Sequence, residues 1–269
     1  MNDDSRSEAR HLWYHNTAVQ FEIVKALKGY ELMIIGEGKR VRWLNVQHVA
    51  MLRKQIEGLH LLGKPSSWYR SLDRYASIPL MSWNLHERQE QSEAWNKGPR
   101  ADAVRGADFG LDLDKKEGSW RDAIRDAEIV CDLFDRYGVR YAFWMSGAHG
   151  FHFVVPFEDM PSAVKTLTYD ELLSFYKRVA LTIAERVPSV DLTIYTPTRV
   201  LKAPYTVEKH GLVILPLDRM SFETLKRHGE EWLRPEFVLK NCLIRDRGVF
   251  RQGSPDGIKR LIDEWEGWT

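Results

Sequence analysis

Gly110-Leu111-Asp112-Leu113-Asp114 places two carboxylates at the end of an apolar run, residues 107–113, that is typical of a buried β-strand. Side chains two positions apart on a strand point to the same face, so Asp112 and Asp114 are expected side by side. Two like charges held this close destabilise a fold unless a cation neutralises them. A divalent metal or an intervening Arg or Lys would do so, and a solvated strand end is the plainer alternative.

The composition limits the class of protein. The chain has 269 residues, of which 43% are hydrophobic, and this supplies enough apolar side chain for a core and excludes a wholly disordered protein. The formal net charge of +1 does not by itself indicate a nucleic-acid binder. A site that holds both metal-binding carboxylates and a polyanion would still average to a charge near zero, so the neutral total excludes little.

Cysteine use and hydropathy indicate the compartment. Cys131 and Cys242 are the only cysteines and lie far apart, which argues against a disulfide scaffold, and no structural zinc is expected. The first ten residues lack the apolar centre of a signal peptide, and no stretch approaches the ~18 apolar residues of a membrane span. We therefore expect an intracellular, cytoplasmic protein with no membrane partner.

The predicted elements indicate an α+β fold in one domain of three parts. Residues 1–106 form an N-terminal α/β lobe, residues 107–220 a central lobe and residues 221–269 a set of C-terminal helices. The N-terminal lobe is predicted to contain a hairpin of strands 31–35 and 41–44. Residues 63–106 show no regular pattern. The central lobe is predicted to contain strands at 107–114, 140–145, 151–156, 190–194, 199–203 and 212–217, with helices at 120–137 and 168–186. The order β-α-β-β-α-β is the split βαβ pattern with an antiparallel sheet.

A glycine-containing turn follows the second strand of this lobe. In Ser146-Gly147-Ala148-His149-Gly150-Phe151-His152 the glycines allow backbone N–H groups to approach an anion closely. Ser146 adds a hydroxyl donor and His152 an imidazole. On one sheet face with the carboxylate pair, this turn would hold a nucleoside triphosphate whose phosphates bridge the metal ions. A core histidine bonded to a carbonyl is the alternative for His152.

A third carboxylate and several cations lie downstream. Asp191 is either a cap between helix and strand or the third ligand of a two-metal site. Positive charge for phosphates is available at Arg199, Lys202, Lys209 and His210.

Basic and aromatic residues alternate in the N-terminal lobe. Arg40, Arg42 and Arg53 belong to a basic segment that is either a solvated face or a wall contacting phosphates. Trp68, Tyr69 and Arg70 suit contact with a nucleic-acid template, and equally suit an aromatic cluster under a long loop.

In this order the motifs resemble the three catalytic motifs of the archaeo-eukaryotic primase superfamily: Gly-Leu-Asp-Leu-Asp, Ser-Gly-x-x-Gly-x-His and Val-Asp-x-Thr. Lys202-Ala203-Pro204-Tyr205-Thr206-Val207 is similar to the segment that follows the third acid in primase small subunits. Its last five residues also resemble the Ala-Pro-Tyr-Ser-Val of bacterial end-joining polymerase domains. Trp68-Tyr69-Arg70-Ser71, with Tyr75 and Pro79, is similar to an upstream motif of primase small subunits.

The resemblance implies an RRM-like catalytic core and a DNA primase or primase-polymerase, an enzyme of template-directed nucleotidyl transfer. Asp112, Asp114 and Asp191 would be catalytic and would hold two Mg²⁺ or Mn²⁺ ions. The nucleotide would be bound by Ser146, Gly147, His149, Gly150, His152, Lys202, Lys209 and His210. The implied partners are single-stranded DNA template, an NTP or dNTP, and a replication or repair protein.

Three departures and three alternatives accompany this interpretation. Many primases carry basic residues in the middle of the second motif, where this chain has Ala148 and His149. Glu208 stands where primase small subunits carry a His, and two cysteines cannot build the zinc knuckle of those subunits. A gap-filling or end-joining repair polymerase that needs a 3′ end is the first alternative. A non-catalytic RRM-like nucleic-acid-binding module, which stacks bases on exposed aromatics, is the second. A metal-dependent phosphohydrolase would share the acids.

Overall fold

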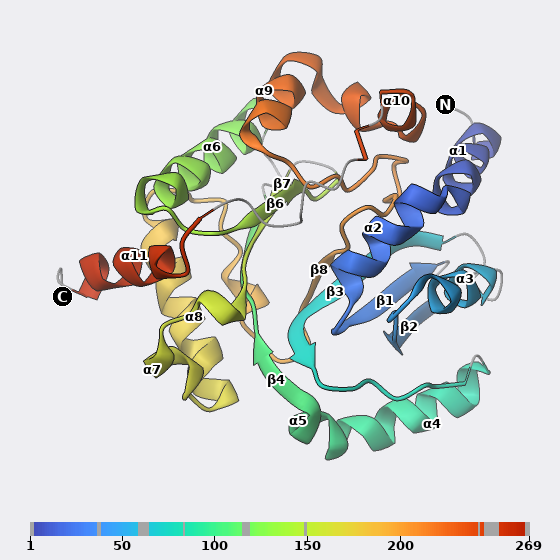
Figure 1. The fold of residues 1–269 in the computed structure, drawn as a ribbon, viewed down its shortest axis with the longest axis horizontal. Coiled ribbons are helices and arrows are strands. Elements are labelled where there is room, and N and C mark those ends of the chain that lie inside the picture. Colours follow the sequence, from blue (N-terminus) through green and yellow to red (C-terminus); the bar gives the residue numbers. More distant parts are fainter. Residues whose placement is uncertain are drawn as a thin grey trace. The chain divides into compact units, whose positions relative to one another are not determined.

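Two units make up the chain in the computed structural model (Figure 1). Unit 1 comprises Met1–Arg105, Val200–Leu215 and Arg227–Arg247, and unit 2 comprises Gly106–Arg199, Pro216–Lys226 and Gly248–Thr269. The structure describes residues 3–36, 39–58, 65–82, 84–114, 119–147, 150–241, 243–244 and 253–266. Within these ranges no helix combines the length and the apolar character that a membrane crossing requires.

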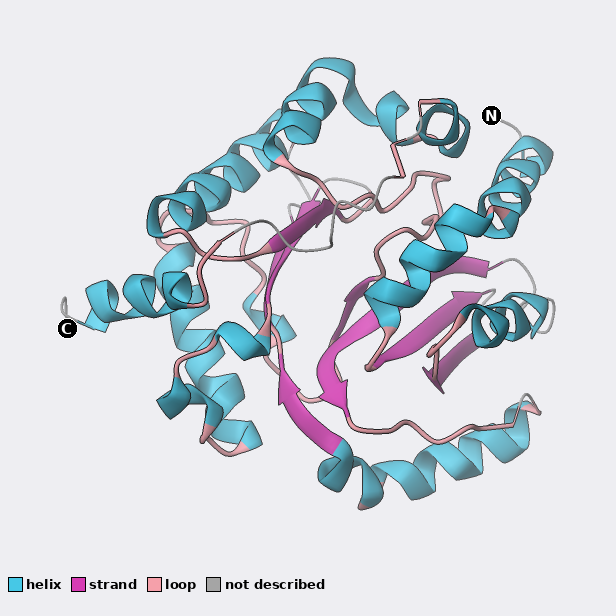
Figure 2. Cartoon of the chain, viewed as in Figure 1, coloured by secondary structure: helices cyan, strands magenta, loops and turns pink. Residues whose placement is uncertain are grey.

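Unit 1 is built on an antiparallel sheet with the strand order β2-β1-β3-β4, to which β8 adds by pairing with β3 (Figure 2). Its strands are β1 Tyr30–Gly36, β2 Lys39–Leu44, β3 Pro65–Tyr75, β4 Val104–Ala107, through which the chain passes into unit 2, and β8 Val200–Lys202. Its helices are α1 Asp3–His15, α2 Thr17–Leu27, α3 Val49–Gly58, α4 Leu85–Asn96, α5 Pro99–Ala103, α10 Pro235–Lys240 and the 3₁₀-helix Gly229–Leu233. The predicted hairpin of residues 31–35 and 41–44 is confirmed as β1 and β2.

Aromatic side chains of unit 1 connect segments that are distant in sequence. The ring of Tyr14 on α1 stacks on that of Trp68 on β3, with 4.8 Å between centroids. The indole Nε1–H of Trp13 donates to the carbonyl of Tyr205 over 2.9 Å. Burial of such large rings supplies much of the free energy that holds the helices on the sheet.

Several charged groups are buried with partners in unit 1. Glu31 is fully buried on β1 and binds the guanidinium of Arg42 on β2 through two contacts of 2.7 and 2.8 Å. Arg88 donates to the carbonyls of Ser82, Arg42 and Met81, and burial lowers its pKa to about 10. These cations are therefore committed to the fold of the unit.

Unit 2 contains a three-stranded antiparallel sheet in the order β5-β7-β6. Its strands are β5 Phe109–Asp114, β6 Ala142–Met145 and β7 Gly150–Val155. Its helices are α6 Trp120–Tyr137, α7 Ser162–Lys165, α8 Tyr169–Ala184, α11 Asp256–Glu266 and the 3₁₀-helices Phe157–Asp159 and Leu192–Ile194. Helix α9, Arg219–His228, begins in unit 2 and ends in unit 1.

Local capping determines where the main helices of unit 2 begin and end. A capping box of Ser119 and Asp122 starts α6, and Gly138, with a left-handed φ of 63°, ends it. The carboxylate of Glu171 accepts from the backbone N–H and the hydroxyl of Thr168 at the start of α8. Both helices were predicted from these residues, and both are confirmed.

The strand register gives the sheet of unit 2 one apolar face. Leu111, Phe153 and Phe143 lie opposite one another across β5, β7 and β6, so their side chains share a face. The rings of Phe143 and Phe153 stack at 5.1 Å between centroids, and Phe134 of α6 meets Phe153 edge-on. Helix α6 therefore covers this face, and the alternate residues of β5 project to the opposite face.

The α+β class with antiparallel sheets is confirmed, but three predicted strands of the central lobe differ. Residues 192–194 form a 3₁₀-helix, and only Val190 makes a bridge, to Leu113. Residues 212–217 contribute isolated bridges, one of them at Pro216, which has no N–H for a ladder. The predicted strand at 199–203 exists as β8, but it pairs with β3 of unit 1.

We predict that Glu31→Gln lowers the free energy of unfolding by about 3 kcal/mol, because it leaves the Arg42 guanidinium without its buried counter-charge. Urea unfolding would measure the change. The matched control is Glu90→Gln, because Glu90 forms only an exposed pair with His86 and should change stability by less than about 0.5 kcal/mol. Equal effects of the two substitutions would contradict the prediction.

Candidate active site

The candidate carboxylates of β5 lie opposite the hairpin formed by β6 and β7. Asp112 pairs with His152, and Asp114 with Gly150, so the acids share a sheet face with the predicted turn. Asp112 is half-buried and Asp114 is exposed, whereas Leu111 and Leu113, which alternate with them, are buried on the other face. The alternation of Asp and Leu thus produces an acidic edge on one face and core on the other.

His152 connects Asp112 to a buried tryptophan. Its Nε2 lies 3.3 Å from Oδ1 of Asp112, and its Nδ1 lies 3.2 Å from Nε1 of Trp144. Trp144 is fully buried and His152 is 4% exposed. The three residues come from adjacent positions on β5, β7 and β6 and therefore form one row across the sheet.

The Trp144 contact assigns the tautomer of His152. An indole N–H can only donate, so Nδ1 of His152 must present its lone pair. The proton of a neutral imidazole is then on Nε2 and directed at Asp112. The Nε2–H of His152 therefore faces the Asp112 carboxylate, with 3.3 Å between Nε2 and Oδ1. This is a structural reason for the histidine beyond the core-histidine alternative.

A backbone ladder brings Asp191 to the same strand. The N–H of Asp191 donates to the carbonyl of Asp112 over 2.8 Å, and the N–H of Asp114 donates to the carbonyl of Ser189 over 2.9 Å. The Asp191 carboxylate caps the following 3₁₀-helix by accepting from the N–H and the hydroxyl of Thr193 at 2.8 and 3.0 Å. Asp191 is thus both a cap and a neighbour of the β5 pair.

The charges of Asp112 and Asp191 both affect the buried hydroxyl of Tyr195. Its hydroxyl donates to the carbonyl of Gly110 over 2.7 Å. Burial raises the pKa of this phenol well above its usual value, and the negative charges of Asp112 and Asp191 raise it further. The phenol stays protonated, and its surroundings disfavour any further negative charge.

The three carboxylates are the right chemical type for a divalent cation, and their backbones lie close together. Their side chains, however, do not converge on one point. Carboxylate oxygens are the ligands that Mg²⁺ and Mn²⁺ prefer. Yet no group of three or more His, Cys, Asp or Glu side chains among the described residues is arranged to hold an ion. The carboxylates of Asp112 and Asp191 point to His152 and Thr193 instead. Rotation of these side chains would be needed for joint ligation.

The glycines of the turn are required by close backbone contacts. A Cβ on Gly150 would lie 2.1 Å from the carbonyl oxygen of Leu113, so a side chain there would separate β7 from β5. Gly147 has a left-handed φ of 97°, and the N–H of Ser146 donates to the carbonyl of Gly150 to close the hairpin. Ser146 is half-buried beside these glycines. His149 lies outside the described residues.

The remaining candidates for nucleotide binding belong to unit 1. Lys202 donates from Nζ to Oγ of Ser67 over 2.7 Å and lies 4.6 Å from the ring centre of Tyr69. Lys209 and His210 are exposed on the turn that follows Val207. The structure therefore brings Ser146, Gly147, Gly150 and His152 together with the acids in unit 2, and it places the three cations in the other unit.

Glu208, a departure from the primase pattern, is buried in that turn. Its carboxylate accepts from the backbone N–H groups of His210 and Leu212 at 2.6 and 3.3 Å. Burial raises its pKa to about 6, against the lowering effect of these bonds and of the Lys202 charge. Glu208 therefore fixes the turn that carries two of the candidate cations.

The candidate template residues have different environments. Arg40 is exposed on β2, and Arg53 is exposed on α3 with Nε bonded to Gln20. Arg42 is committed to Glu31. Trp68 and Arg70 are buried, with the Arg70 guanidinium 4.1 Å from the ring centre of Tyr30. Trp68 and Arg70 therefore expose no surface on which a base could stack, which agrees with the alternative of a buried aromatic cluster.

Sequence reasoning missed Trp144 and Tyr195. The signal for Trp144 was present, because a hairpin closed around Ser146 to Gly150 sets Trp144 opposite His152. Tyr195 had no such signal, because its contact with Gly110 joins segments 85 residues apart.

No protein-family model and no curated protein sequence matches the chain. A search of solved structures finds similarity to the polymerase domain of Ligase D from Mycobacterium tuberculosis in complex with DNA. The TM-score is 0.52 at 15% sequence identity, and the match covers 84% of this chain and 90% of that domain. At this identity the likeness is one of fold, and the chain has the α+β fold of that polymerase domain.

We predict that Trp144→Phe releases the His152 tautomer, because the ring keeps its bulk but loses the N–H donor. The ¹⁵N chemical shifts of the imidazole nitrogens would change from an Nε2–H pattern to a mixture of tautomers. Trp120→Phe is the control, since Trp120 is half-buried at the start of α6 and its ring contacts Phe151 instead. An unchanged Nε2–H pattern in the Trp144 variant would contradict the tautomer assignment.

Glu208→Gln tests the buried carboxyl. A pKa raised from 4.5 to about 6 in the folded state favours the protonated acid, so the wild type loses stability as pH rises from 4.5 through 6. At 1.36 kcal/mol per pKa unit the loss is about 2 kcal/mol, and the glutamine variant should not show it. Urea unfolding at pH 4 and pH 7.5, with exposed Glu236→Gln as control, would measure it. A difference between variant and wild type that is constant with pH would refute the assignment.

Proposed function

We propose that the chain is a nucleotidyltransferase that adds nucleotides to a DNA strand under the direction of a single-stranded template. The observation that carries this proposal is the gathering of Asp112, Asp114 and Asp191 around one strand end, beside His152, in a fold similar to a polymerase domain. The motif order supports membership of the archaeo-eukaryotic primase superfamily. The substrates would be an NTP or dNTP and DNA.

The three acids would hold Mg²⁺ or Mn²⁺. Such ions, when bound, would activate the attacking 3′-hydroxyl and neutralise charge on the leaving pyrophosphate. The backbone bonds from Asp191 to Asp112 and from Asp114 to Ser189 hold the two segments together, and joint ligation would require rotation of the side chains. Tyr195, held on the carbonyl of Gly110, supports the strand beneath them.

His152 would have two successive partners. In the described arrangement its Nε2–H faces Asp112. Rotation of Asp112 would free this N–H for a phosphate oxygen of the nucleotide, and Trp144 would keep the proton on Nε2 in both states. Ser146, half-buried at the start of the turn, would offer its hydroxyl to the same phosphates. Lys202, Lys209 and His210 are proposed as further phosphate contacts.

Extension of an existing 3′ end is the second form of the activity, and one observation favours it over primer synthesis. The fold is similar to a polymerase domain of a ligase, whereas no comparison supports a primase activity. The primase reading rests on the motifs alone. A replication or repair protein remains the proposed partner in either case.

The non-catalytic alternative receives no support from the sheet of unit 2. Base stacking needs exposed aromatic rings on the sheet surface. Every aromatic residue of β5, β6 and β7 is buried: Phe109, Phe143, Trp144, Phe151 and Phe153 are each at most 1% exposed.

The test is incorporation of labelled nucleotides on single-stranded DNA with Mg²⁺ or Mn²⁺, with and without an annealed primer. We predict that Asp112→Asn and Asp114→Asn each reduce incorporation by about 100-fold or more, because they remove charged ligands. Asp263→Asn on α11, an exposed acid paired with Lys259, is the control and should retain activity.

Each outcome has a distinct meaning. Products without primer would establish primer synthesis, and products only with primer would establish a repair or extension polymerase. Incorporation that survives in both aspartate variants would refute the site. Nucleotide hydrolysis without incorporation would instead favour the phosphohydrolase alternative.

A further inference from the structure

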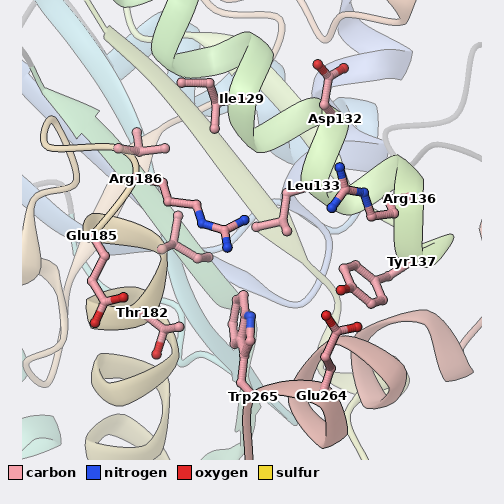
Figure 3. A pocket seen from close by; sticks show the side chains of 12 residues that line it. Ile129, Asp132, Leu133, Arg136, Tyr137, Thr182, Glu185, Arg186, Glu264 and Trp265 are labelled. Atoms are coloured by element: carbon pink, nitrogen blue, oxygen red, sulfur yellow. The ribbon is translucent and has the colours of Figure 1, made fainter. Parts of the chain in front are cut away.

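A cavity of about 630 Å³ lies within unit 2, between the second half of α6, the end of α8 and the end of α11 (Figure 3). Its size is within the roughly 300–1,000 Å³ typical of sites for small molecules. None of the residues that line it belongs to the candidate active site. Helix α6 covers the apolar face of the sheet through Phe134, whereas the acids project from the opposite face.

One wall of the cavity is apolar and includes an indole. Leu133 of α6 and Ile183 and Val187 at the end of α8 supply aliphatic side chains. The ring of Trp265 on α11 also lines the cavity, and it is only half-buried. A half-buried indole beside open volume is a surface on which a flat ring can stack.

Two guanidinium groups face the same cavity, that of Arg136 on α6 and that of Arg186 in the turn after α8. Figure 3 shows Arg186 extending over it between Leu133 and Trp265, and Arg136 beside Tyr137. Both positive charges lower the pKa of the Tyr137 hydroxyl, which places them near one another. Within the described part of the chain, neither guanidinium has a hydrogen bond or ion pair.

Three acids, Asp132, Glu185 and Glu264, also line the cavity. Asp132 binds Arg219, whose guanidinium also contacts Asp135. Glu264 accepts a hydrogen bond from the hydroxyl of Tyr137, which raises the pKa of that phenol. Glu185 is exposed at the rim, where Figure 3 shows it directed away from the two arginines. Two guanidinium groups thus face the cavity, and Glu264 is held by Tyr137 in the same lining.

We infer that this cavity is a binding site for a nucleoside phosphate, separate from the candidate active site. The guanidinium groups of Arg136 and Arg186 bind the phosphate, and Trp265 stacks on the base. Arginine presents a planar fork of donors that matches phosphate oxygens bidentately. The aliphatic wall covers the opposite face of the base. A bare inorganic anion would leave the apolar wall and the indole without a function.

The bound nucleoside phosphate is either a free nucleotide or one nucleotide of a DNA strand, and the experiment distinguishes the two. Binding is measured by calorimetry with adenosine 5′-monophosphate on a full chain that carries Asp112→Asn and Asp114→Asn, with EDTA present. This background removes metal-dependent binding at the candidate active site, so the result does not depend on the proposed polymerase activity. Adenosine, inorganic phosphate and an oligothymidylate without terminal phosphate are the comparison ligands.

Saturable binding of the monophosphate, tighter than that of adenosine or phosphate alone, is expected. Arg186→Gln and Arg136→Gln should each weaken it by about tenfold or more, since each removes charge-assisted hydrogen bonds. Trp265→Leu should weaken it as well. Arg125→Gln is the matched control, because Arg125 is exposed on the same helix α6 but does not line the cavity. Circular dichroism and thermal melts verify that each variant is folded.

Competition decides the source. An oligonucleotide that displaces the monophosphate, and whose binding is lost in the same variants, assigns the site to a strand; failure to compete assigns it to a free nucleotide. Absence of saturable monophosphate binding would overturn the inference. So would equal weakening by Arg125→Gln, or affinity that survives both pocket-arginine substitutions. A shift of the Trp265 indole N–H resonance on binding, present in Arg125→Gln and lost in Arg186→Gln, gives an independent readout.

Discussion

The register of β5 against β7 is the constraint on which unit 2 depends. Pairing Asp112 with His152 places Leu111 and Leu113 opposite phenylalanines on the covered face. A shift by one residue would exchange the two faces, burying both carboxylates under α6 and exposing the leucines. The close contact of Gly150 with the carbonyl of Leu113 fixes this register, because no other residue fits there. Core and candidate site are therefore specified by the same hydrogen bonds.

The same register concentrates negative charge at one strand end. Asp112 and Asp191 both act on the buried phenol of Tyr195, and Asp114 follows two residues later. In the described arrangement His152 lies 3.3 Å from Asp112, and Thr193 donates a hydrogen bond to Asp191. A divalent cation would relieve this repulsion most effectively, which is the physical argument for metal at this position.

The parts of this arrangement that local chemistry determines could be predicted from sequence. The strand of β5, the capped helices α6 and α8, and the hairpin around Ser146 follow from patterns within a few residues. Strand β3 was missed because Arg70 and Asp73 interrupt its apolar pattern. Their burial depends on Tyr30 and Arg100, which are distant in sequence. The pairing of β8 with β3 was likewise unreadable, since it connects residues 69 and 202.

Asp191 caps the 3₁₀-helix that follows it, and the proposed metal site would require its carboxylate to turn. Its carboxylate accepts two hydrogen bonds from Thr193, each worth roughly 1.5–3 kcal/mol to a charged acceptor. Turning toward a cation would give up part of this, unless one oxygen kept the N–H of Thr193 while the other ligated. Arg199 donates to the Thr193 hydroxyl oxygen over 3.1 Å, but a guanidinium has no acceptor for the hydroxyl proton that Asp191 now receives. The spacing Val-Asp-x-Thr thus supplies a carboxylate that is held by its backbone bond to Asp112 and by Thr193 at its side chain.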